Sequence, residues 1–329
     1  MKIAIIKLSS LGDIVHTMVV LQFIKKNYPE SKIDWIVEKK FKEVLVHNPH
    51  INQIHTVNIN DAKKNNSIKL FFREVMIVKS FGSYDLAIDF QGLIKTAIIS
   101  RFLDSKKIIG FGGLSAREGV ASFAYNQHVN IGYDQNTILR YLKLASEALS
   151  VNITQSDIEN KKPYLFFKSK VAIPRKRYIV FVIGSTWESR NYPKEKFVEV
   201  ANALKMVCVV IWGNDKEKNK AEWMEKRSDY IQSAPKLSLD QLKYIIQNAS
   251  LLIGNDTGPS HMSWALNIPS ILLFGPTPVE RTFQTPTNIA LKSSSKINHF
   301  KLNKNDFSIK EITVKDVVKI AKDLLLASA

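Results

Sequence analysis

The chain has 329 residues, of which 45% are apolar, and 47 Lys and Arg residues against 30 Asp and Glu give it a net charge of +17. This length exceeds what one core of ordinary size holds, so two domains are expected. The single cysteine, Cys208, lies in an apolar run, which excludes an internal disulfide framework and a multi-cysteine metal site.

The positive charge favours anionic partners such as nucleic acid, anionic lipid or phosphorylated small molecules, but it does not choose among them. Basic pairs such as Lys25-Lys26 and Lys106-Lys107 are spread along the chain, and a lysine-rich proteome would give the same pattern. No apolar stretch reaches the roughly 20 residues of a membrane helix, and the first ten residues have too short an apolar core for a secretory signal. We therefore expect a cytoplasmic protein.

The first half of the chain alternates short apolar runs with helical patterns. Ile14, Met18 and Leu21 recur at helical spacing between the first two runs. The alternation predicts βα units and a mainly parallel sheet. The predicted strands lie in residues 2–8, 32–38, 53–59, 84–90 and 106–112.

The pattern breaks in residues 152–176, a charged segment with two prolines, and then restarts. We predict strands in 177–185, 206–213, 250–258 and 269–277, and helices in 194–204, 216–227, 238–248 and 259–266. The last residues form an amphipathic helical pattern. The predicted organisation is α/β, with doubly wound domains at 1–160 and 161–310 and a terminal helix at 311–329.

Ligands of doubly wound sheets bind beyond the carboxyl ends of the strands. The loops after the predicted strands therefore should hold the chemistry. Polar or aromatic side chains at such positions are Asp13, Asp89, Ser185, Trp212 and Asp256.

Asp13 lies in "KLSSLGDIVHT", where the first strand gives way to a helix. A short oxygen side chain there accepts a bond from an unpaired backbone N–H. On this local pattern, the favoured interpretation is that Asp13 caps a helix beginning at Ile14.

The segment "GNDTGPSHMSWAL" is the strongest local signal. Unpaired N–H groups at a helix start, next to a glycine that permits close approach, make an anion site. The alternative is that Asp256 or Thr257 merely caps the helix. A cap does not require the whole set of Asp, Thr, Gly, Ser260 and His261, so a phosphate site is the favoured interpretation.

The segment "GSTWESRNYP" repeats this logic after the first strand of the second half. Ser185 and Thr186 offer hydroxyls, and Arg190 offers a planar cation suited to phosphate oxygens. A plain polar loop before the helix is an equally good interpretation of this segment alone. Two anion-capable loops in one half, however, point to a diphosphate.

In the first half, Lys95 and Arg117 add cations to the same loop side. Lys95 could instead extend along an apolar surface, and Arg117 could pair with Glu118 at the surface. No Asp-x-Asp pair, Walker phosphate loop or HExxH motif occurs, and the seven histidines form no recognisable ligand set. These absences predict metal-independent chemistry without a cofactor. The near-match "GFGGLS" is weak support for a dinucleotide site.

Five segments together resemble the ADP-heptose:lipopolysaccharide heptosyltransferases, in order and over nearly the whole chain. They are "KLSSLGDIVHT", "IDFQGLIKTA", "GLSAREGVASFAY", "STWESRNYP" and "GNDTGPSHMSWALNIPSILLFGPT". The first three are most similar to the heptosyltransferase I branch. The resemblance implies a GT-B fold of two Rossmann-like domains facing across a cleft. It also implies inverting, metal-independent transfer of L-glycero-D-manno-heptose from ADP-heptose to the inner Kdo of Kdo-lipid A.

The resemblance also implies roles for single residues. Asp13 corresponds to the general base, and the acceptor side comprises Ser10, Gly12, Lys95 and Arg117. The donor side comprises Ser185, Thr186, Arg190, Glu217, Leu237, Asp256, Thr257, Gly258 and His261. Glu217 corresponds to a ribose-binding acid and Leu237 to the adenine contact. Two departures stand out: this branch usually has lysine where Arg190 stands and tryptophan where Tyr192 stands.

These roles give a mechanism in which Asp13 takes the proton of the acceptor hydroxyl while Arg190 and the N–H groups at Thr257 and Gly258 stabilise the departing ADP. The expected partners are ADP-heptose, Kdo-lipid A and the anionic cytoplasmic face of the inner membrane, with no nucleic acid. A heptosyltransferase II-type enzyme acting on a heptosylated acceptor is one alternative. A non-catalytic basic protein that binds lipid or nucleic acid is the other.

Overall fold

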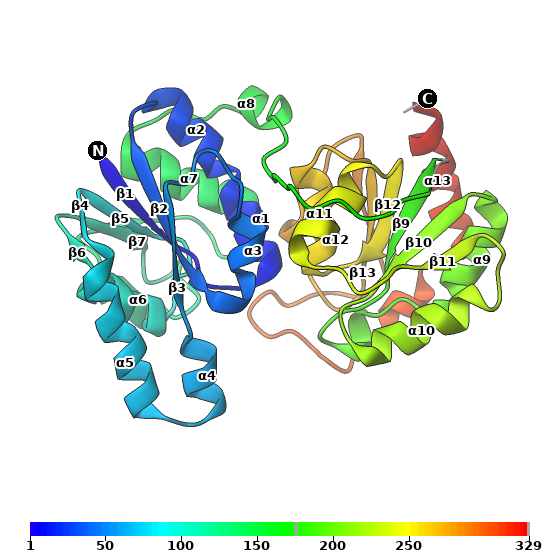
Figure 1. Cartoon of the computed structure of the whole chain (residues 1–329), viewed down its shortest axis with the longest axis horizontal. Coiled ribbons are helices and arrows are strands. Elements are labelled where there is room, and N and C mark those ends of the chain that lie inside the picture. Colours follow the sequence, from blue (N-terminus) through cyan, green and yellow to red (C-terminus); the bar gives the residue numbers. More distant parts are fainter. Residues whose placement is uncertain (175–176, 328–329) are drawn as a thin grey trace. The chain divides into compact units, whose positions relative to one another are not determined.

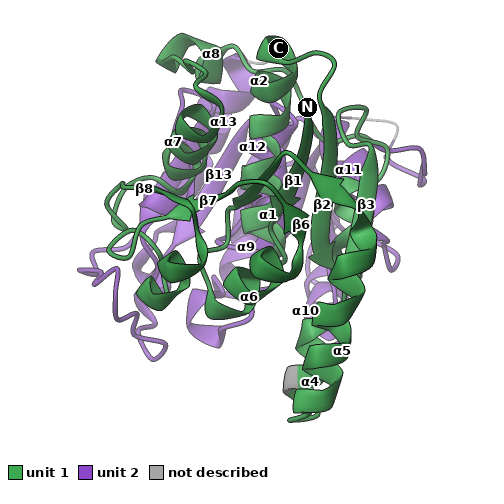
Figure 2. Cartoon of the chain, turned by 90° about the vertical axis from the view of Figure 1, so that its left-hand side faces the viewer, with its two compact units in different colours: residues 1–166 green, residues 167–329 purple. Residues whose placement is uncertain are grey.

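The structure is a computed structural model, and it describes residues 1–174 and 177–327. The chain divides into two compact units, residues 1–166 and 167–329 (Figure 2). The predicted domain limits at residues 160 and 310 stay predictions.

Unit 1 is built around a six-stranded parallel sheet with the order β3-β2-β1-β5-β7-β8. In this sheet Ile6 lies opposite both Ile36 and Asp89. The strand order reverses between β1 and β5, the place where open α/β sheets bind ligands. The strands are β1 (Lys2–Ile6), β2 (Lys32–Glu38), β3 (Gln53–Val57), β5 (Leu86–Asp89), β7 (Ile108–Phe111) and β8 (Gln127–Val129), with β4 (Ser83–Tyr84) paired to β6 (Asp104–Ser105).

Helices cover both faces of this sheet (Figure 1). One group contains α1 (Leu11–Met18), α2 (Val20–Asn27) and α7 (Thr137–Leu149), and the other contains α5 (Ile68–Val78), α6 (Ile94–Phe102) and the 3-10 helix η3 (Gly119–Ala124). The remaining helices are η1 (Lys39–Phe41), α3 (Lys42–Leu45), α4 (Ile59–Lys64), η2 (Lys79–Phe81) and α8 (Gln155–Glu159). Because both faces are covered, all of β2 after Lys32 is buried, which explains its near-continuous apolar run.

Unit 2 repeats this architecture, with a parallel sheet ordered β11-β10-β9-β12-β13-β14. Its order reverses between β9 and β12. The strands are β9 (Tyr178–Val182), β10 (Val207–Ile211), β11 (Ile231–Ser233), β12 (Leu251–Asn255), β13 (Ser270–Phe274) and β14 (Asn288–Lys292). The helices are η4 (Glu188–Arg190), α9 (Lys194–Leu204), α10 (Asp215–Glu225), α11 (Leu239–Gln247), α12 (Gly258–Ala265), η5 (Val279–Arg281), η6 (Ser308–Glu311) and α13 (Val314–Ala327).

The terminal helix α13 packs against α9 and buries Val317, Ala321 and Leu324 in the core of unit 2. Cys208 lies in the same core, as expected from its apolar run. The fold class is confirmed: two Rossmann-like domains, each with a parallel sheet between helices. No helix within residues 1–174 and 177–327 is long and apolar enough to span a membrane.

One local prediction is wrong. Helix α1 begins at Leu11, three residues before the predicted start, so Asp13 lies in its first turn and is not its cap. Ser10, with an extended backbone, takes the cap position, and its carbonyl accepts from the N–H of Ile14 at 2.9 Å. Asp13 reaches back instead, and its Oδ2 accepts from the backbone N–H of Ser10 at 3.1 Å and from its hydroxyl at 2.8 Å.

Candidate functional site

The two predicted anion loops of unit 2 follow neighbouring strands, because β9 and β12 pair with Gly254 opposite Val182. Asn255, fully buried at the end of β12, joins the loops. Its amide oxygen accepts from the N–H of Tyr192 at 2.9 Å, and its Nδ2 donates to the carbonyl of Ile183 at 2.8 Å. Sequence reasoning missed this positioning residue, although it lies inside the "GNDTG" motif.

Asp256 is the centre of a buried charged cluster. Its Oδ2 lies 3.3 Å from Nη1 of Arg190 and 3.8 Å from Nη1 of Arg281, and its Oδ1 lies 3.1 Å from Nε2 of His261. Arg190 also donates from Nη2 to Oγ1 of Thr186 at 2.6 Å. The structure therefore brings four of the predicted donor residues together and adds Arg281, which sequence reasoning missed.

Helix α12 begins directly after this cluster. Thr257 occupies its cap position, but the Thr257 side chain makes no capping hydrogen bond. Gly258 and Pro259 form the first turn, so the helix start presents backbone N–H groups and the positive end of its dipole. Because Asp256 binds Arg190 and His261, the plain capping interpretation does not describe this loop.

The protonation states follow from the cluster's charges. Burial raises the pKa of Asp256, but His261, Arg281 and Arg190 outweigh burial and hold it well below its usual range. Burial lowers the pKa of Arg190, and the carboxylate of Asp256 opposes that shift. Guanidinium groups stay protonated in proteins. One carboxylate faces two guanidinium groups, so the cluster carries excess positive charge at neutral pH.

Five buried polar atoms in or near these loops lack a hydrogen-bond partner within the described part of the chain. They are Oγ of Ser185, Oγ of Ser189, Nε of Arg190, Oδ1 of Asn191 and Oγ1 of Thr277. Thr277 follows β13, which pairs with β12, and only 1% of it is exposed. Unsatisfied buried polar groups are uncommon and call for an explanation. Their clustering beside cations and helix N–H groups fits an anionic ligand.

Glu217 lies in the first turn of α10 and reaches the β9 loop. Its Oε2 accepts from the N–H of Gly213 at 2.7 Å, and its Oε1 accepts from Nδ2 of Asn214 at 2.7 Å. A Cβ on Gly184 would lie 2.1 Å from the carboxyl carbon of Glu217. A side chain at position 184 would therefore collide with the carboxylate of Glu217.

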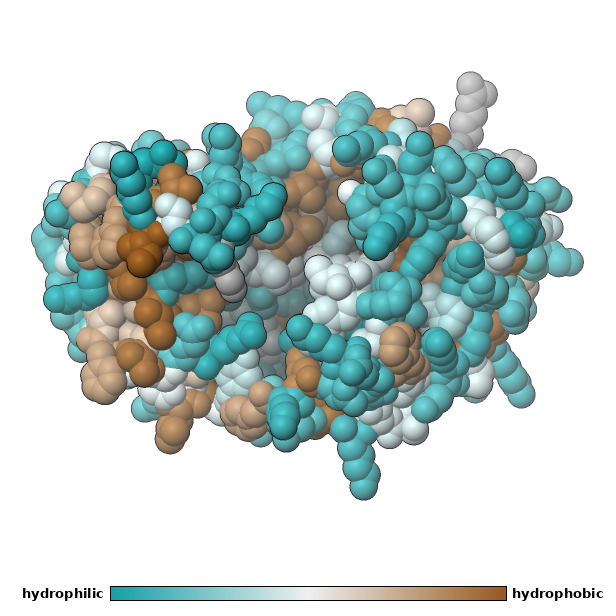
Figure 3. All heavy atoms as spheres, turned by 90° about the horizontal axis from the view of Figure 1, so that it is seen from below, coloured by the Kyte–Doolittle hydropathy of each residue, from teal (hydrophilic) through white to brown (hydrophobic). Residues whose placement is uncertain are grey.

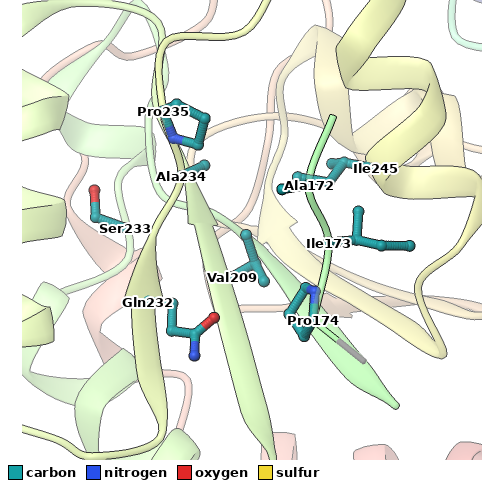
Figure 4. A pocket seen from close by; sticks show the side chains of 9 residues that line it. All are labelled: Ala172, Ile173, Pro174, Val209, Gln232, Ser233, Ala234, Pro235 and Ile245. Carbon is teal, nitrogen blue, oxygen red and sulfur yellow. The ribbon is translucent and has the colours of Figure 1, made fainter. Parts of the chain in front are cut away.

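Leu237 is half-buried on the loop after β11, and β10 separates that strand from β9. A pocket of about 240 Å³ lies nearby, lined by residues 172–174, Val209, 232–235 and Ile245 (Figure 4). None of the predicted site residues lines this pocket. Its lining contains no basic side chain and so offers no cation for a phosphate.

In unit 1, Asp13 belongs to a chain of hydrogen bonds. The hydroxyl of Tyr141 donates to Oδ1 of Asp13 at 3.3 Å, and Nζ of Lys7 donates to that hydroxyl at 2.8 Å and to the carbonyl of Phe90 at 3.0 Å. Tyr141 and Lys7 are buried, whereas Asp13 is partly exposed. Sequence reasoning missed Tyr141, which lies 128 residues away. The hydroxyl of Tyr141 therefore holds one carboxylate oxygen of Asp13, and the carboxylate stays partly exposed to solvent.

Lys7 gives this network a pH dependence. Burial lowers its pKa to about 8, although Asp13 and Asp89 oppose the shift. An unfolded lysine has a pKa of about 10.4. Between these values the unfolded chain binds more protons than the folded chain, so the Lys7 contribution to stability rises with pH.

We expect Lys7→Met to reveal this contribution as a difference from the wild type. The free energy of unfolding of the wild type minus that of Lys7→Met should rise by about 2 kcal/mol between about pH 7 and pH 9.5. Urea unfolding of both proteins at several pH values measures it, and the subtraction cancels the titrations of groups that do not interact with Lys7. If the difference between the two free energies of unfolding stays flat or falls with pH, Lys7 does not have a lowered pKa in the folded protein.

The loops after β1 and β5 are also joined. Oε1 of Gln91 accepts from the N–H groups of Leu8 and Ser9, both at 3.1 Å. Asp89 is fully buried and accepts from the hydroxyl of Tyr125 at 2.8 Å. Burial raises the pKa of Asp89, and its hydrogen bonds only partly oppose this. Asp89 therefore stabilises the loops after β1 and β5 from the protein interior.

The predicted acceptor residues lie at the starts of α1 and α6 and on the loop between β7 and η3. Lys95 is in the first turn of α6 and is half-buried, whereas Arg117 is exposed on the loop between β7 and η3. Glu118 accepts from the N–H of Ile94 at 2.8 Å, and so ties this loop to the helix start. Gly12 is buried in the first turn of α1 between Ser10 and Asp13. The neighbouring positions of Arg117 and Glu118 in the sequence suggested a surface ion pair. Glu118 instead accepts a hydrogen bond from the N–H of Ile94.

Within residues 1–174 and 177–327, no three His, Cys, Asp or Glu side chains form a group that could hold a metal ion.

Comparison with known proteins places this architecture in a family. The family description glycosyltransferase family 9 (heptosyltransferase) matches residues 79–312. The chain is 36% identical to lipopolysaccharide heptosyltransferase 1 of Campylobacter coli, over 98% of this chain and 99% of the relative. It has the fold of E. coli heptosyltransferase WaaC solved with ADP, with a TM-score of 0.80, 24% identity, and coverage of 100% of this chain and 99% of the other.

WaaC solved with ADP-2-deoxy-2-fluoro heptose aligns equally well, with a TM-score of 0.80, 23% identity, and coverage of 98% and 99% of the two chains. The family match covers more than half of the chain, and the 36% identity to the Campylobacter protein extends over nearly all of it. The GT-B architecture follows from the fold shared with these structures. The chain belongs to glycosyltransferase family 9, the heptosyltransferases, and is a glycosyltransferase.

Proposed function

We propose that this enzyme is an inverting, metal-independent heptosyltransferase. It transfers L-glycero-D-manno-heptose from ADP-heptose to the inner Kdo of Kdo-lipid A in lipopolysaccharide inner-core biosynthesis. The observation that carries the proposal is the cluster of Arg190, Asp256 and His261 beside the start of α12. The relative named lipopolysaccharide heptosyltransferase 1, and the shared fold of a structure solved with ADP, support this choice of donor and acceptor.

The donor diphosphate binds between the loops after β9 and β12. Arg190 and the N–H groups of Thr257 and Gly258 face its charge, and the hydroxyls of Ser185 and Thr186 donate to its oxygens. The five unsatisfied buried atoms and the excess positive charge of the cluster support this placement. Asp256 and His261 hold the heptose, Glu217 holds the ribose, and Leu237 packs on the adenine.

Gly184→Ala is expected to weaken ADP binding about 10-fold, which corresponds to about 1.4 kcal/mol. The added Cβ would collide with the carboxyl carbon of Glu217 at 2.1 Å and displace the ribose contact. Titration calorimetry with ADP measures the effect. Gly213→Ala is the matched control, because its Cβ would lie at an ordinary 3.5 Å from Oε2 of Glu217 and should leave the affinity near normal. Equal affinities for the two variants would argue against a ribose role for Glu217.

On the acceptor side, Asp13 acts as the general base and removes the proton of the attacking hydroxyl. The bond to the anomeric carbon forms as the bond to ADP breaks on the opposite face, which inverts the configuration. Ser10 and Gly12 shape the loop that carries the base. Lys95 and Arg117 bind the anionic groups of the acceptor, consistent with the place of Lys95 at the start of α6 and of Arg117 on the loop that Glu118 ties to this helix start.

The acceptor is a membrane lipid, so the enzyme works in the cytoplasm at the inner face of the inner membrane. The net charge of +17 supports attraction to this anionic surface, to lipid A phosphates and to Kdo carboxylates. Nucleic acid is not a partner in this proposal.

Mass spectrometry of the acceptor after incubation with the purified protein and ADP-heptose tests the function. Kdo-lipid A should gain the mass of one heptose, and the gain should persist in EDTA. Transfer only to an acceptor that already carries heptose would indicate a heptosyltransferase II-type enzyme. Absence of transfer to Kdo-lipid A by a folded, ADP-binding protein would overturn the proposal.

A further inference from the structure

Large hydrophobic side chains are exposed mainly in one region of unit 1. Eight of the thirteen such residues in the described part of the chain lie between residues 68 and 123. We name this group the apolar face, and it consists of Ile68, Phe72, Met76, Ile77, Ile94, Leu114, Val120 and Phe123. Single exposed apolar residues are ordinary, whereas a contiguous group marks an interaction site.

Helix α5 contributes a regular stripe to the apolar face. Ile68, Phe72 and Met76 follow one another at intervals of four residues, which places them on one side of a helix. Their exposed fractions are 73%, 52% and 50%. The opposite side of α5 buries Val75 and Val78 in the core of unit 1. The helix is therefore apolar on both its core side and its solvent side.

The apolar face extends over three packed elements and the loop before η3. Helix α5 packs against α6, and α6 packs against η3. Leu114 and Phe123 are 96% and 89% exposed, and Ile94 at the start of α6 is 47% exposed. In the view of Figure 3, hydrophobic side chains appear in several groups with hydrophilic side chains between them.

Basic side chains border the apolar face. Lys69 and Arg73 are exposed on α5 beside the stripe, and Arg117 is exposed between Leu114 and Val120, next to exposed Glu118, whose Oε2 accepts from the N–H of Ile94. The single acidic residue of α5, Glu74, is buried; its Oε2 accepts from the N–H of Asn58 at 2.7 Å, and its Oε1 lies 3.4 Å from Arg73. The exposed side of α5 therefore presents cations and apolar groups but no exposed carboxylate.

We propose that the apolar face docks onto an anionic phospholipid bilayer, with its hydrophobic side chains among the headgroups and upper acyl chains and its basic side chains on lipid phosphates. Amphipathic helices with apolar and basic groups bind membrane interfaces in this way. Basic residues near an anionic surface add an attraction that salt screens, and buried apolar area adds a part that salt does not screen.

Charge argues against a second copy of the chain as the occupant. Two such faces packed together would bring Lys69 and Arg73 of both copies close, which like-charge repulsion opposes. An anionic lipid surface complements these cations. The inference deepens the membrane contact of the proposed function by naming the surface, and it does not depend on heptosyl transfer.

Vesicle flotation tests the proposal with the full-length protein. The probes are phosphatidylcholine vesicles with or without about 30% phosphatidylglycerol. A variant carrying Phe72→Ser, Met76→Ser, Leu114→Ser and Phe123→Ser should partition at least about 10-fold less onto the anionic vesicles than the wild type. Phe300→Ser is the matched control, because Phe300 is 79% exposed in unit 2. It should bind like the wild type.

Salt separates the apolar part from the electrostatic part. Wild-type binding should fall in about 0.5 M NaCl but persist, whereas binding of the four-serine variant should vanish. Transfer to a water-soluble, deacylated acceptor should be equal in both proteins, so loss of docking and loss of catalysis are distinguishable. Unchanged binding of a folded four-serine variant, complete release of the wild type by salt, or a wild-type dimer that the serines dissociate would each overturn the proposal.

Discussion

Asp13→Asn is expected to lower kcat for heptose transfer about 10³-fold, within the range of 10² to 10⁴ that general bases contribute. An amide cannot accept the acceptor's proton, although it has nearly the shape of the carboxylate. One amide oxygen can still receive the N–H and hydroxyl of Ser10, which now bind Oδ2 of Asp13. Helix α1 should therefore keep its start, and the loss should lie in catalysis.

Steady-state kinetics with ADP-heptose and Kdo-lipid A measure this loss, together with calorimetry for ADP and a melting temperature. ADP affinity and melting temperature should stay close to those of the wild type, because the proposed donor loops lie in unit 2. A kcat within a factor of a few of the wild type would remove Asp13 from its role as base. A parallel collapse of the melting temperature would instead mean that its bonds to Ser10 are mainly structural.

The second large effect is expected from Arg190→Met, which should lower kcat/KM about 10² to 10³-fold and weaken ADP binding. Losing one preorganised donor to a developing anion costs about this much. Arg190 is only 8% exposed, so most of its guanidinium is held by protein contacts and is already desolvated. Its Nε is unsatisfied. Asp256 would keep His261 and Arg281, so its carboxylate stays paired.

Arg190→Lys is the conservative control, since this branch usually has lysine at that position. It should recover most of the activity through its charge, but it cannot hold both Asp256 and Thr186 as the planar guanidinium does. Steady-state kinetics and ADP titration on Arg190→Met and Arg190→Lys test whether Arg190 stabilises the leaving group. Wild-type kcat/KM in Arg190→Met would contradict leaving-group stabilisation by this residue.

Much of the fold could be predicted from the sequence because buried parallel strands are short apolar runs. The runs at 32–38 and 250–258 contain β2 and β12, and the helix predicted at 194–204 is α9. Three of the four edge strands of the two six-stranded sheets were missed: β8, β11 and β14 are short or carry polar residues, because one side of an edge strand has no neighbour in the sheet. Helix α5 was not predicted, although its apolar residues recur at helical spacing.

The candidate site also contains residues that the sequence could predict and residues that it could not. Thr186, Arg190, Asp256 and His261 occur in two motifs, so they could be named before any contact was known. Arg281 and Tyr141 contact Asp256 and Asp13 from distant parts of the chain, and no local pattern marks them. Only the folded backbone brings η5 and α7 to these carboxylates.

The central claim is that Asp13 deprotonates the acceptor while the loops of unit 2 stabilise the departing diphosphate. A crystal structure with ADP-2-deoxy-2-fluoro heptose and a deacylated Kdo acceptor tests it most directly. The account predicts the diphosphate on Arg190 and the N–H groups of Thr257 and Gly258, with the carboxylate of Asp13 about 3 Å from the attacking hydroxyl. Asp13 pointing away from a correctly bound acceptor, or a diphosphate bound elsewhere, would contradict it.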